Sequence, residues 1–144
     1  AARRFELKFK QNGITVADDS APHPSEIAAT LTGAKNTGAK RIITVFQPHT
    51  YSRTHDLFDG FVKALSLSDR VILPDIYAAR ESDTLGVSSE KLANAIGEKA
   101  TYMKSFEEIA ASLAKEAREG DLILTMGAGD VYKIGDLLKE ALAK

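Results

Sequence analysis

The sequence predicts an α/β fold in which a mostly parallel sheet is the middle of three layers and helices cover both faces. Strand patterns alternate with amphipathic helix patterns along most of the 144 residues, and an antiparallel hairpin comes first. Residues 41–46 and 121–126 are nearly continuous apolar runs, as expected of parallel strands buried on both faces. Such a doubly covered open sheet is Rossmann-like.

The hairpin is predicted at the amino-terminal end. Residues 5–10 alternate apolar and charged side chains, which is typical of a half-exposed strand. Gln11-Asn12-Gly13 is a turn signal, because Asn-Gly tolerates positive φ, and residues 14–17 are the expected returning strand. Asp18-Asp19 ends that strand.

The remaining elements follow in strand and helix order. Pro24 opens a helix, since proline suits the first helical turn, and the helix closes near Gly33 to Gly38. A second helix is expected at 54–66, with Leu57, Phe61 and Leu65 on its buried face. The other predicted elements are strands at 41–46, 70–74, 101–103 and 121–126, and helices at 88–96, 106–118 and from the 127–130 turn to 142.

Composition and charge are those of a soluble globular domain. The apolar fraction is 44%, the charged fraction 27% and the net charge −1, so neither nucleic acid nor an acidic membrane is an expected partner. Without cysteine there are no disulfides, thiolate metal sites or cysteine nucleophile. No signal peptide or membrane span is recognisable. We therefore expect one cytoplasmic domain, 1–144, which begins so abruptly at Arg3-Arg4 that it looks cut from a longer chain.

The densest polar cluster follows the strand at 41–46. The apolar run ends at Gln47-Pro48, and a series of polar side chains comes next: His49, Thr50, Tyr51, Ser52, Arg53 and Thr54. Ligands of open α/β sheets bind beyond the carboxyl ends of strands, and these groups suit an anion such as a carboxylate or phosphate. They equally suit a solvated turn with Ser52 or Thr54 as helix cap, so the loop alone leaves both interpretations open.

Three further clusters stand at predicted strand ends. Asp18-Asp19 suits sugar hydroxyls or Mg²⁺, but also turn amides, and the nearby His23 suits a solvated loop. The segment 75–81 is polar, but also fits an exposed loop with an Arg80–Glu81 surface pair. Gly127-Ala128-Gly129-Asp130 lacks the full phosphate-binding signatures, so we interpret it as a tight structural turn.

Six ordered segments together carry a resemblance to a known family. They are Arg3-Arg4-Phe5, Asn12-Gly13, Asp18-Asp19 with His23-Pro24-Ser25-Glu26-Ile27, Phe46-Gln47-Pro48-His49-Thr50-Tyr51-Ser52-Arg53-Thr54, Asp75-Ile76-Tyr77-Ala78-Ala79-Arg80-Glu81 and Thr125-Met126-Gly127-Ala128-Gly129-Asp130. In this order, they resemble the carboxy-terminal domain of the Mur ligase family over nearly the whole chain.

The resemblance implies a part in a larger, ATP-dependent ligase of peptidoglycan precursor synthesis. Such enzymes also have an amino-terminal UDP-sugar domain and a central ATPase domain, which this sequence lacks. The segments 46–54 and 125–130 most resemble members that join UDP-N-acetylmuramate to L-alanine. The complete enzyme would then use ATP and Mg²⁺, bound mainly outside this chain, and the isolated domain would be inactive.

The resemblance also implies binding roles for individual residues. Arg4 (or its neighbour Arg3) would reach the ATP phosphates, and Asp19 would contact the ribose. His49 and Arg53 would bind the incoming amino acid, whose carboxylate a guanidinium can bind through both oxygens. It implies no catalytic residue and no metal ligand within this domain.

Two departures and two alternatives remain. The family usually has Asp-Tyr-x-His-His-Pro, but Ser20 and Pro22 replace the aromatic residue and the first histidine, so the ligand contacts there are rearranged, the sequence is altered or the activity is weak. A phosphoacceptor receiver domain would use the paired aspartates and Asp75, yet Met126-Gly127 stands where its lysine belongs. A non-catalytic amino-acid or nucleotide-binding module is the second alternative, and ligand affinity of the isolated chain would favour it.

Overall fold

The computed structural model describes residues 5–127 and 129–144 and contains six strands and six helices in that part of the chain. The strands are β1 (Glu6–Gln11), β2 (Ile14–Asp19), β3 (Arg41–Phe46), β4 (Arg70–Leu73), β5 (Ala100–Tyr102) and β6 (Asp121–Met126). The helices are α1 (Pro24–Lys35), α2 (Tyr51–Asp56), α3 (Phe58–Leu65), α4 (Ser89–Ile96), α5 (Phe106–Glu116) and α6 (Lys133–Leu142).

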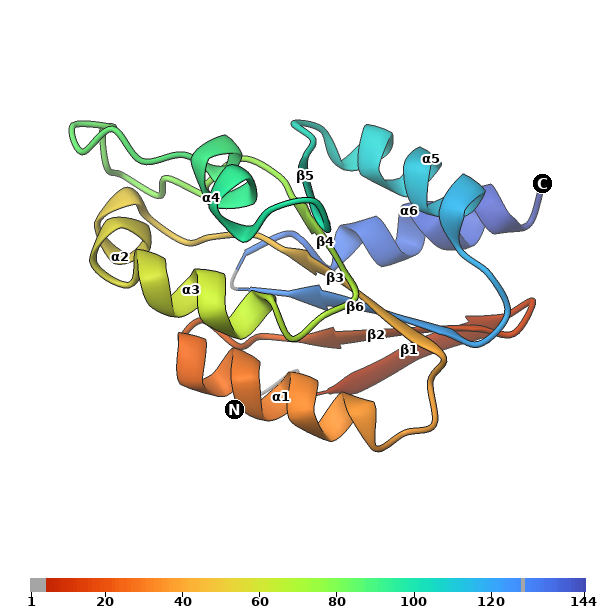
Figure 1. The fold of residues 1–144 in the computed structure, drawn as a ribbon. Coiled ribbons are helices and arrows are strands. Elements are labelled where there is room, and N and C mark those ends of the chain that lie inside the picture. Colours follow the sequence, from red (N-terminus) through yellow and green to blue (C-terminus); the bar gives the residue numbers. More distant parts are fainter. Residues whose placement is uncertain (1–4, 128) are drawn as a thin grey trace.

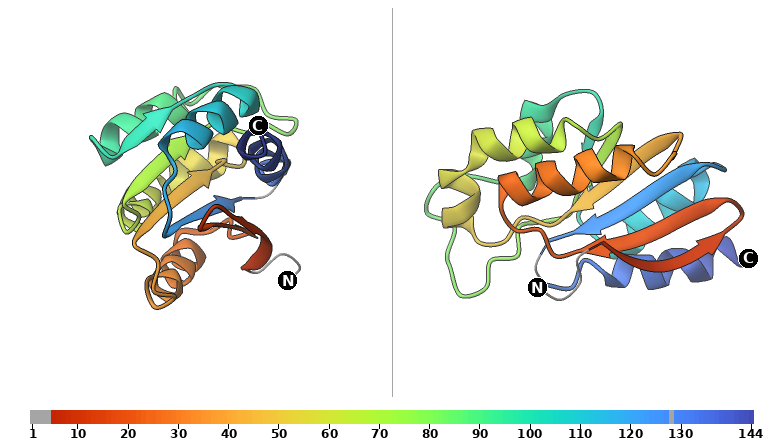
Figure 2. Two further views of the ribbon diagram at one scale, coloured as in Figure 1. Left: turned by 90° about the vertical axis from the view of Figure 1, so that its right-hand side faces the viewer. Right: turned by 90° about the horizontal axis from the view of Figure 1, so that it is seen from below.

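All six strands form one sheet, in the order β1-β2-β6-β3-β4-β5. β1 and β2 are the predicted antiparallel hairpin, and every other neighbouring pair is parallel. Asn12 and Gly13 turn the hairpin with φ values of 55° and 76°, as the turn signal predicts. Figure 2 shows the hairpin at one edge of the sheet, beside β6. The predicted α/β fold is therefore confirmed.

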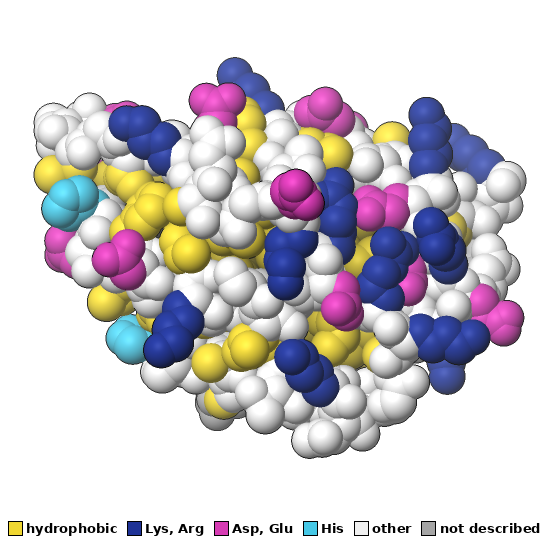
Figure 3. All heavy atoms as spheres, viewed as in Figure 1, with side chains coloured by type: hydrophobic (Ala, Val, Ile, Leu, Met, Phe, Trp, Pro, Cys, Tyr) yellow, Lys and Arg dark blue, Asp and Glu magenta, His cyan; other side chains and the backbone are white. Residues whose placement is uncertain are grey.

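Each face of the sheet has its own apolar core. Along β3, Ile42 and Phe46 face α1, α3 and α4, whereas Ile43 and Val45 face α5 and α6. This alternation follows from the two-residue period of a strand. Figure 1 shows the two helical layers on opposite sides of the sheet, and in the same view Lys and Arg side chains are interspersed with Asp and Glu side chains over the surface (Figure 3). In the described part of the chain, no helix is both long and apolar enough to cross a membrane.

The predicted helix at 54–66 is two helices in the structure. α2 begins at Tyr51 because the Thr50 hydroxyl accepts a hydrogen bond from the Arg53 backbone N at 3.3 Å and so caps it. Leu57 ends α2 and begins α3, with φ −111° and ψ 19° and no side-chain cap. The apolar stripe hides this break, since Leu57 and Phe58 pack against the core on either side of it.

β2 is longer than predicted and includes Asp18 and Asp19, which pair in parallel with Thr125 and Met126 of β6. Neighbouring strand residues point to opposite faces, so the two carboxylates are separated by the sheet. Asp18 accepts a hydrogen bond from the Thr125 hydroxyl at 2.7 Å, and Asp19 accepts one from Thr30 of α1 at 3.0 Å. They therefore do not form the paired site or the turn contacts that the sequence suggested.

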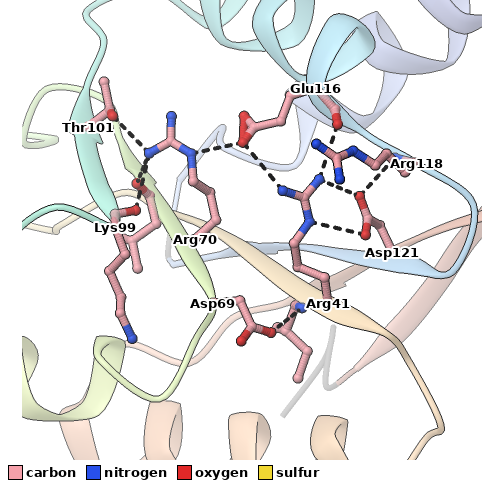
Figure 4. A network of polar contacts seen from close by, with 10 residues as sticks. Arg41, Asp69, Arg70, Lys99, Thr101, Glu116, Arg118 and Asp121 are labelled. Carbon is pink, nitrogen blue, oxygen red and sulfur yellow. Dashed lines mark hydrogen bonds and ion pairs between the residues drawn. The ribbon is translucent and has the colours of Figure 1, made fainter.

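A polar network joins the amino ends of the parallel strands (Figure 4). Arg41, the first residue of β3, donates to the two carboxylate oxygens of Asp121 at 3.2 and 2.7 Å. It also donates to the backbone O of Glu116 at 3.1 Å, and Asp121 accepts from the Arg118 backbone N at 2.8 Å. Asp121 is only 3% exposed, so this bidentate pair is largely shielded from water.

The network continues to the neighbouring strands through Arg70, the first residue of β4. Its Nε donates to the Glu116 carboxylate at 2.9 Å, and its Nη1 donates to Thr101 Oγ1 at 2.7 Å and Lys99 O at 3.1 Å. The amino ends of β6, β3, β4 and β5 are thus linked through side chains (Figure 4).

Removing one partner of this buried pair should destabilise the fold. In Asp121→Ala, Arg41 loses its bidentate partner in a half-buried place and keeps only the Glu116 carboxylate at 3.8 Å, so we expect a loss of about 3 kcal/mol in the free energy of unfolding. Urea denaturation at pH 7 measures it. Lys133→Ala, which removes the exposed Asp130–Lys133 pair at 3.7 Å, should change stability by less than about 0.5 kcal/mol. Equal effects of the two variants would contradict the structural role of the network.

Candidate functional site

Hydrogen bonds join the carboxyl ends of four neighbouring strands into one edge, which we call the strand-end rim. Gly127 N donates to Asp19 O at 3.1 Å, linking β6 to β2. Gln47 N donates to Met126 O at 3.0 Å, linking β3 to β6. The Gln47 side chain donates from Nε2 to Asp75 O at 3.2 Å, just beyond β4. Loops distant in sequence therefore meet along the rim.

The topology makes this rim the expected place for a ligand. After β2 and β3 the chain turns to α1 and α2–α3 on one face of the sheet, whereas after β6 it turns to α6 on the other (Figure 1). Connections that leave adjacent strands toward opposite faces open a crevice at the strand ends, where ligands of α/β proteins bind.

The turn after β6 approaches Gln47 closely. Gly127 has φ +122°, and a Cβ there would lie 2.6 Å from Gln47 O, so only glycine fits. This agrees with the interpretation of the segment as a tight turn, although Ala128 lies outside the described residues. A Cβ on Gly129 would lie 3.5 Å from Gln47 Oε1. In the described structure that oxygen has no hydrogen-bond partner, although Gln47 is only 7% exposed.

His49 packs against the loop that follows β4. Its ring is stacked on that of Tyr77, with centroids 5.4 Å apart and an interplanar angle of 12°. The backbones are joined as well: Thr50 N donates to Tyr77 O at 2.7 Å, and Tyr77 N donates to Pro48 O at 2.8 Å. The imidazole is thereby fixed in both position and orientation.

Arg53 lies in the first turn of α2, four residues after His49, which precedes the helix. Its Nη1 is 3.5 Å from His49 Nδ1. A guanidinium only donates hydrogen bonds, so Nδ1 is the acceptor and the hydrogen of the neutral ring is on Nε2. Both side chains then present N–H groups to a ligand.

The pKa of His49 favours the neutral ring. Burial, followed by the positive charge of Arg53, lowers this pKa from the ordinary value of 6.5, while the Glu81 carboxylate acts in the opposite direction. A neutral N–H donor next to a guanidinium suits an anion better than a cation. A carboxylate fits both groups, because it can accept hydrogen bonds through two oxygens.

Glu81 binds α2 directly. Its two carboxylate oxygens accept from Ser52 N at 2.9 Å and from the Ser52 hydroxyl at 2.5 Å. The hydroxyl first, and then the backbone N–H, lower the pKa of Glu81 below its ordinary value, so it is ionised at neutral pH. The sequence suggested that Glu81 pairs with Arg80 on the surface of this loop. That interpretation is wrong, because the partner of Glu81 is Ser52.

Arg53 opens onto a surface pocket of about 510 Å³. It is lined by Thr50, Ser52, Arg53, Asp56, Leu57 and Glu81. The pocket therefore lies between the start of α2 and the loop after β4, with a single guanidinium among hydroxyl and carboxylate groups.

Asp19 lies at the same edge of the sheet but in a separate pocket. Its Oδ2 accepts from Phe5 N at 3.1 Å and from Thr30 Oγ1 at 3.0 Å, and the residue is only 3% exposed. The pocket, of about 430 Å³, lies beside α1 and is lined also by Ala29, Gly33 and Thr37. With β6 between β2 and β3, the ends of the two strands that lead to these sites are roughly two strand spacings, or about 10 Å, apart.

The structure thus brings together His49 and Arg53, and it places Asp19 along the same rim. The expectation for Arg4 falls outside the described residues. His23 belongs to neither pocket: its Nδ1 accepts from Ser25 N at 3.1 Å and caps α1, while Ser25 Oγ lies 2.9 Å from the same atom. His23, which lies between Pro22 and Pro24, therefore caps the start of α1.

Sequence reasoning gave Tyr77 and Glu81 no individual role, although it marked their segment as polar. The signal that points to these two residues is the adjacency of β3 and β4, which brings the loops after the two strands side by side. Among the described residues, no group of three or more histidines and carboxylates is close enough to hold a metal ion.

The fold and the rim together define an α/β domain of the doubly wound class, with hydrogen-bond donors of His49 and Arg53 at the carboxyl ends of its strands. The chain belongs to the family of the Mur ligase, glutamate ligase domain, whose model matches residues 3–129. The expected family resemblance is therefore confirmed.

Curated relatives are longer than this chain. It is 54% identical over 144 residues to the UDP-N-acetylmuramate–L-alanine ligase of Clostridium novyi (strain NT), covering 98% of this chain and 31% of the relative. It is 55% identical over 141 residues to the enzyme of the same name from Lachnospira eligens, covering 95% and 31%. The chain thus spans about a third of the length of these relatives.

Solved structures share the fold. UDP-N-acetylmuramate-alanine ligase MurC from Thermotoga maritima matches with a TM-score of 0.75 and 26% identity, over 96% of this chain and 29% of that chain. A domain from Haemophilus ducreyi matches with a TM-score of 0.72 and 29% identity, over 96% and 99%. Since the second was crystallised as a single domain, a unit of this kind can be studied by itself.

The contact of Arg53 with His49 can be tested by titration. Because its charge lowers the His49 pKa, Arg53→Met should raise that pKa, though not to 6.5, since burial remains. Arg53→Lys retains the charge and should leave the pKa lower than in the methionine variant. NMR titration of the imidazole in the 144-residue chain measures this. The same His49 pKa in all three proteins would show that the two side chains do not interact.

Proposed function

We propose that these residues are the C-terminal domain of an ATP-dependent UDP-N-acetylmuramate–L-alanine ligase that acts in peptidoglycan precursor synthesis. The observation that carries the proposal is the pairing of His49 and Arg53 at the strand-end rim, in a chain 54% identical to ligases of that name. The amino-terminal and central domains of the complete protein would be its partners.

The reaction class sets what the domain has to do. A carboxylate is a poor electrophile, so ATP-dependent ligases first convert it to an acyl phosphate, which the amine of the second substrate attacks with release of phosphate. ADP is the other product. The amine must be held close to the reacting carbon in the correct orientation, because such positioning supplies a large part of the rate enhancement.

His49 and Arg53 are proposed to bind the carboxylate of L-alanine. The guanidinium binds both oxygens or shares them with the His49 Nε2–H, and either arrangement directs the amine away from the rim. Stacking on Tyr77 fixes the imidazole before the ligand arrives, which lowers the ordering cost of binding. This domain would thus position the amino acid without supplying a catalytic group.

The second pocket is proposed to face the nucleotide. Asp19 is among the residues that line the pocket beside α1, and a carboxylate can accept hydrogen bonds from ribose hydroxyls. Arg4 would reach the phosphates. The main phosphate and Mg²⁺ sites of ATP would lie outside this chain. Ser20 and Pro22, next to Asp19, leave this side without the family's aromatic residue and first histidine, so we expect weaker nucleotide contacts here.

Substitution of Arg53 tests the assignment of the amino-acid subsite. In the complete gene product, Arg53→Ala should raise the KM for L-alanine roughly 10- to 100-fold, the value of a hydrogen bond to a charged group. The KM for ATP should change little. Steady-state ligation assays measure both constants. Arg118→Ala, an exposed arginine at the opposite edge of the sheet, is the control; unchanged L-alanine saturation in Arg53→Ala would remove Arg53 from the subsite.

The isolated 144-residue chain should not catalyse ligation. It has no recognisable ATP phosphate loop, so no ADP should form when it is mixed with ATP, UDP-N-acetylmuramate and L-alanine. A coupled ADP assay on the purified chain measures this, with the complete gene product as positive control. ADP formation that depends on both other substrates would show that the domain contains a complete active site.

A further inference from the structure

The loops after β3 and β4 are joined at two points, on either side of Thr50. Before it, the backbone of Tyr77 bonds to Pro48 O and Thr50 N. After it, both carboxylate oxygens of Glu81 bond to Ser52. We call residues 77–81 the clasp loop.

We propose that Glu81 is a positioning residue of the amino-acid subsite: by binding Ser52 it fixes the first turn of α2, and so the place of Arg53 relative to His49. This inference deepens the proposed function, on which it rests, because the subsite is the one formed by Arg53 and His49.

The position of Ser52 makes Glu81 effective. Ser52 directly precedes Arg53, and its N–H and hydroxyl are bound together, so the backbone can neither slide nor rotate at this residue. Arg53 N is bound to the Thr50 hydroxyl at 3.3 Å, a longer and weaker contact. Thr54 also donates to Thr50 O, from its backbone N at 3.2 Å and from its hydroxyl at 2.7 Å. Those bonds lie within the helix start itself, whereas the Glu81 contacts tie the first turn of α2 to the neighbouring loop and so fix its place relative to the rest of the rim.

Backbone strain makes such a restraint necessary. Thr50 has φ 67° and ψ 148°, a region almost confined to glycine, and its β-branched side chain makes it less favourable still. Ala79, in the clasp loop, also has positive φ, at 57°. Strained residues persist only where surrounding contacts hold them, and the two joints on either side of Thr50 are those contacts.

The bonding pattern of Glu81 directs its carboxylate oxygens to Ser52 rather than to Arg53. Glu81 and Arg53 line the same pocket, where a carboxylate without hydrogen bonds would attract the guanidinium. Both oxygens of Glu81 are bound to Ser52 instead. Arg53 thus remains available for the carboxylate of an incoming amino acid.

Exposure separates this positioning role from a role in folding. Glu81 is exposed to solvent, and exposed polar contacts contribute little to global stability. Loss of its carboxylate should therefore change the geometry of the subsite while leaving the rest of the fold intact.

The test compares two substitutions of Glu81 in the complete gene product. Glu81→Ala should raise the KM for L-alanine about tenfold, since small displacements of a binding group have effects of this size or larger. Glu81→Gln should restore it to within about threefold, because its amide oxygen can accept from Ser52 N while its NH₂ group donates to the Ser52 hydroxyl. The KM for ATP and the melting temperature should stay unchanged. Asp83→Ala, whose carboxylate caps Gly86 N at 3.2 Å within its own loop, is the matched control.

A second measurement tests the contact between Glu81 and Ser52 without a ligation assay. In the 144-residue chain, the ¹⁵N order parameter of the Arg53 amide should fall in Glu81→Ala and recover in Glu81→Gln.

The outcomes are distinguishable. If Arg53→Ala raises the KM for L-alanine but Glu81→Ala does not, the positioning role of Glu81 is overturned and the proposed function stands. An unchanged order parameter overturns the positioning role whatever the ligation assay shows. A complete gene product that cannot ligate L-alanine overturns the proposed function, even if the order parameter falls.

Discussion

The close approach of Gly127 to Gln47 is the constraint on which the strand-end rim depends. A Cβ at Gly127 would lie 2.6 Å from Gln47 O, and so would push the end of β6 away from β3. The bond from Gln47 N to Met126 O, the last link between β3 and β6 at this end of the sheet, would then be strained. His49 follows Gln47 by only two residues. The lack of a side chain at Gly127, just after β6, therefore influences where the loop after the neighbouring β3 lies.

Much of the fold could be predicted because it follows from local periodicity. The two-residue and 3.6-residue apolar patterns located every strand and most helices, and a parallel sheet followed from their order. The break at Leu57 could not be predicted, since a helix can break while its apolar side chains remain buried. The extension of β2 through Asp18 and Asp19 was missed because adjacent aspartates usually indicate a turn. Their place in a buried strand depends on distant partners, Thr125 for Asp18 and Thr30 for Asp19.

The candidate site divides in the same way. His49 and Arg53 lie four residues apart around a helix start, so a single loop brings them together and its sequence indicates the anion site. Tyr77 and Glu81 reach that site from another strand, and their roles depend on the adjacency of β3 and β4 in the sheet. The order of strands in a sheet is a property of the whole chain. No local pattern around Tyr77 or Glu81 encodes it.

The polar contacts at the two ends of the parallel strands differ in how much they are expected to stabilise the fold. At the amino ends, Arg41 and Asp121 form a bidentate pair in a half-buried place, where loss of Asp121 would leave Arg41 with only the more distant Glu116 carboxylate, at 3.8 Å. At the carboxyl ends, the contacts of Glu81 are exposed and add little to stability, yet they surround a strained Thr50. Strain at a binding loop has to be held locally, and it costs stability that contacts elsewhere offset. The bonded amino ends of the strands can thus offset the cost of the strained backbone at the carboxyl ends, where the proposed amino-acid subsite lies.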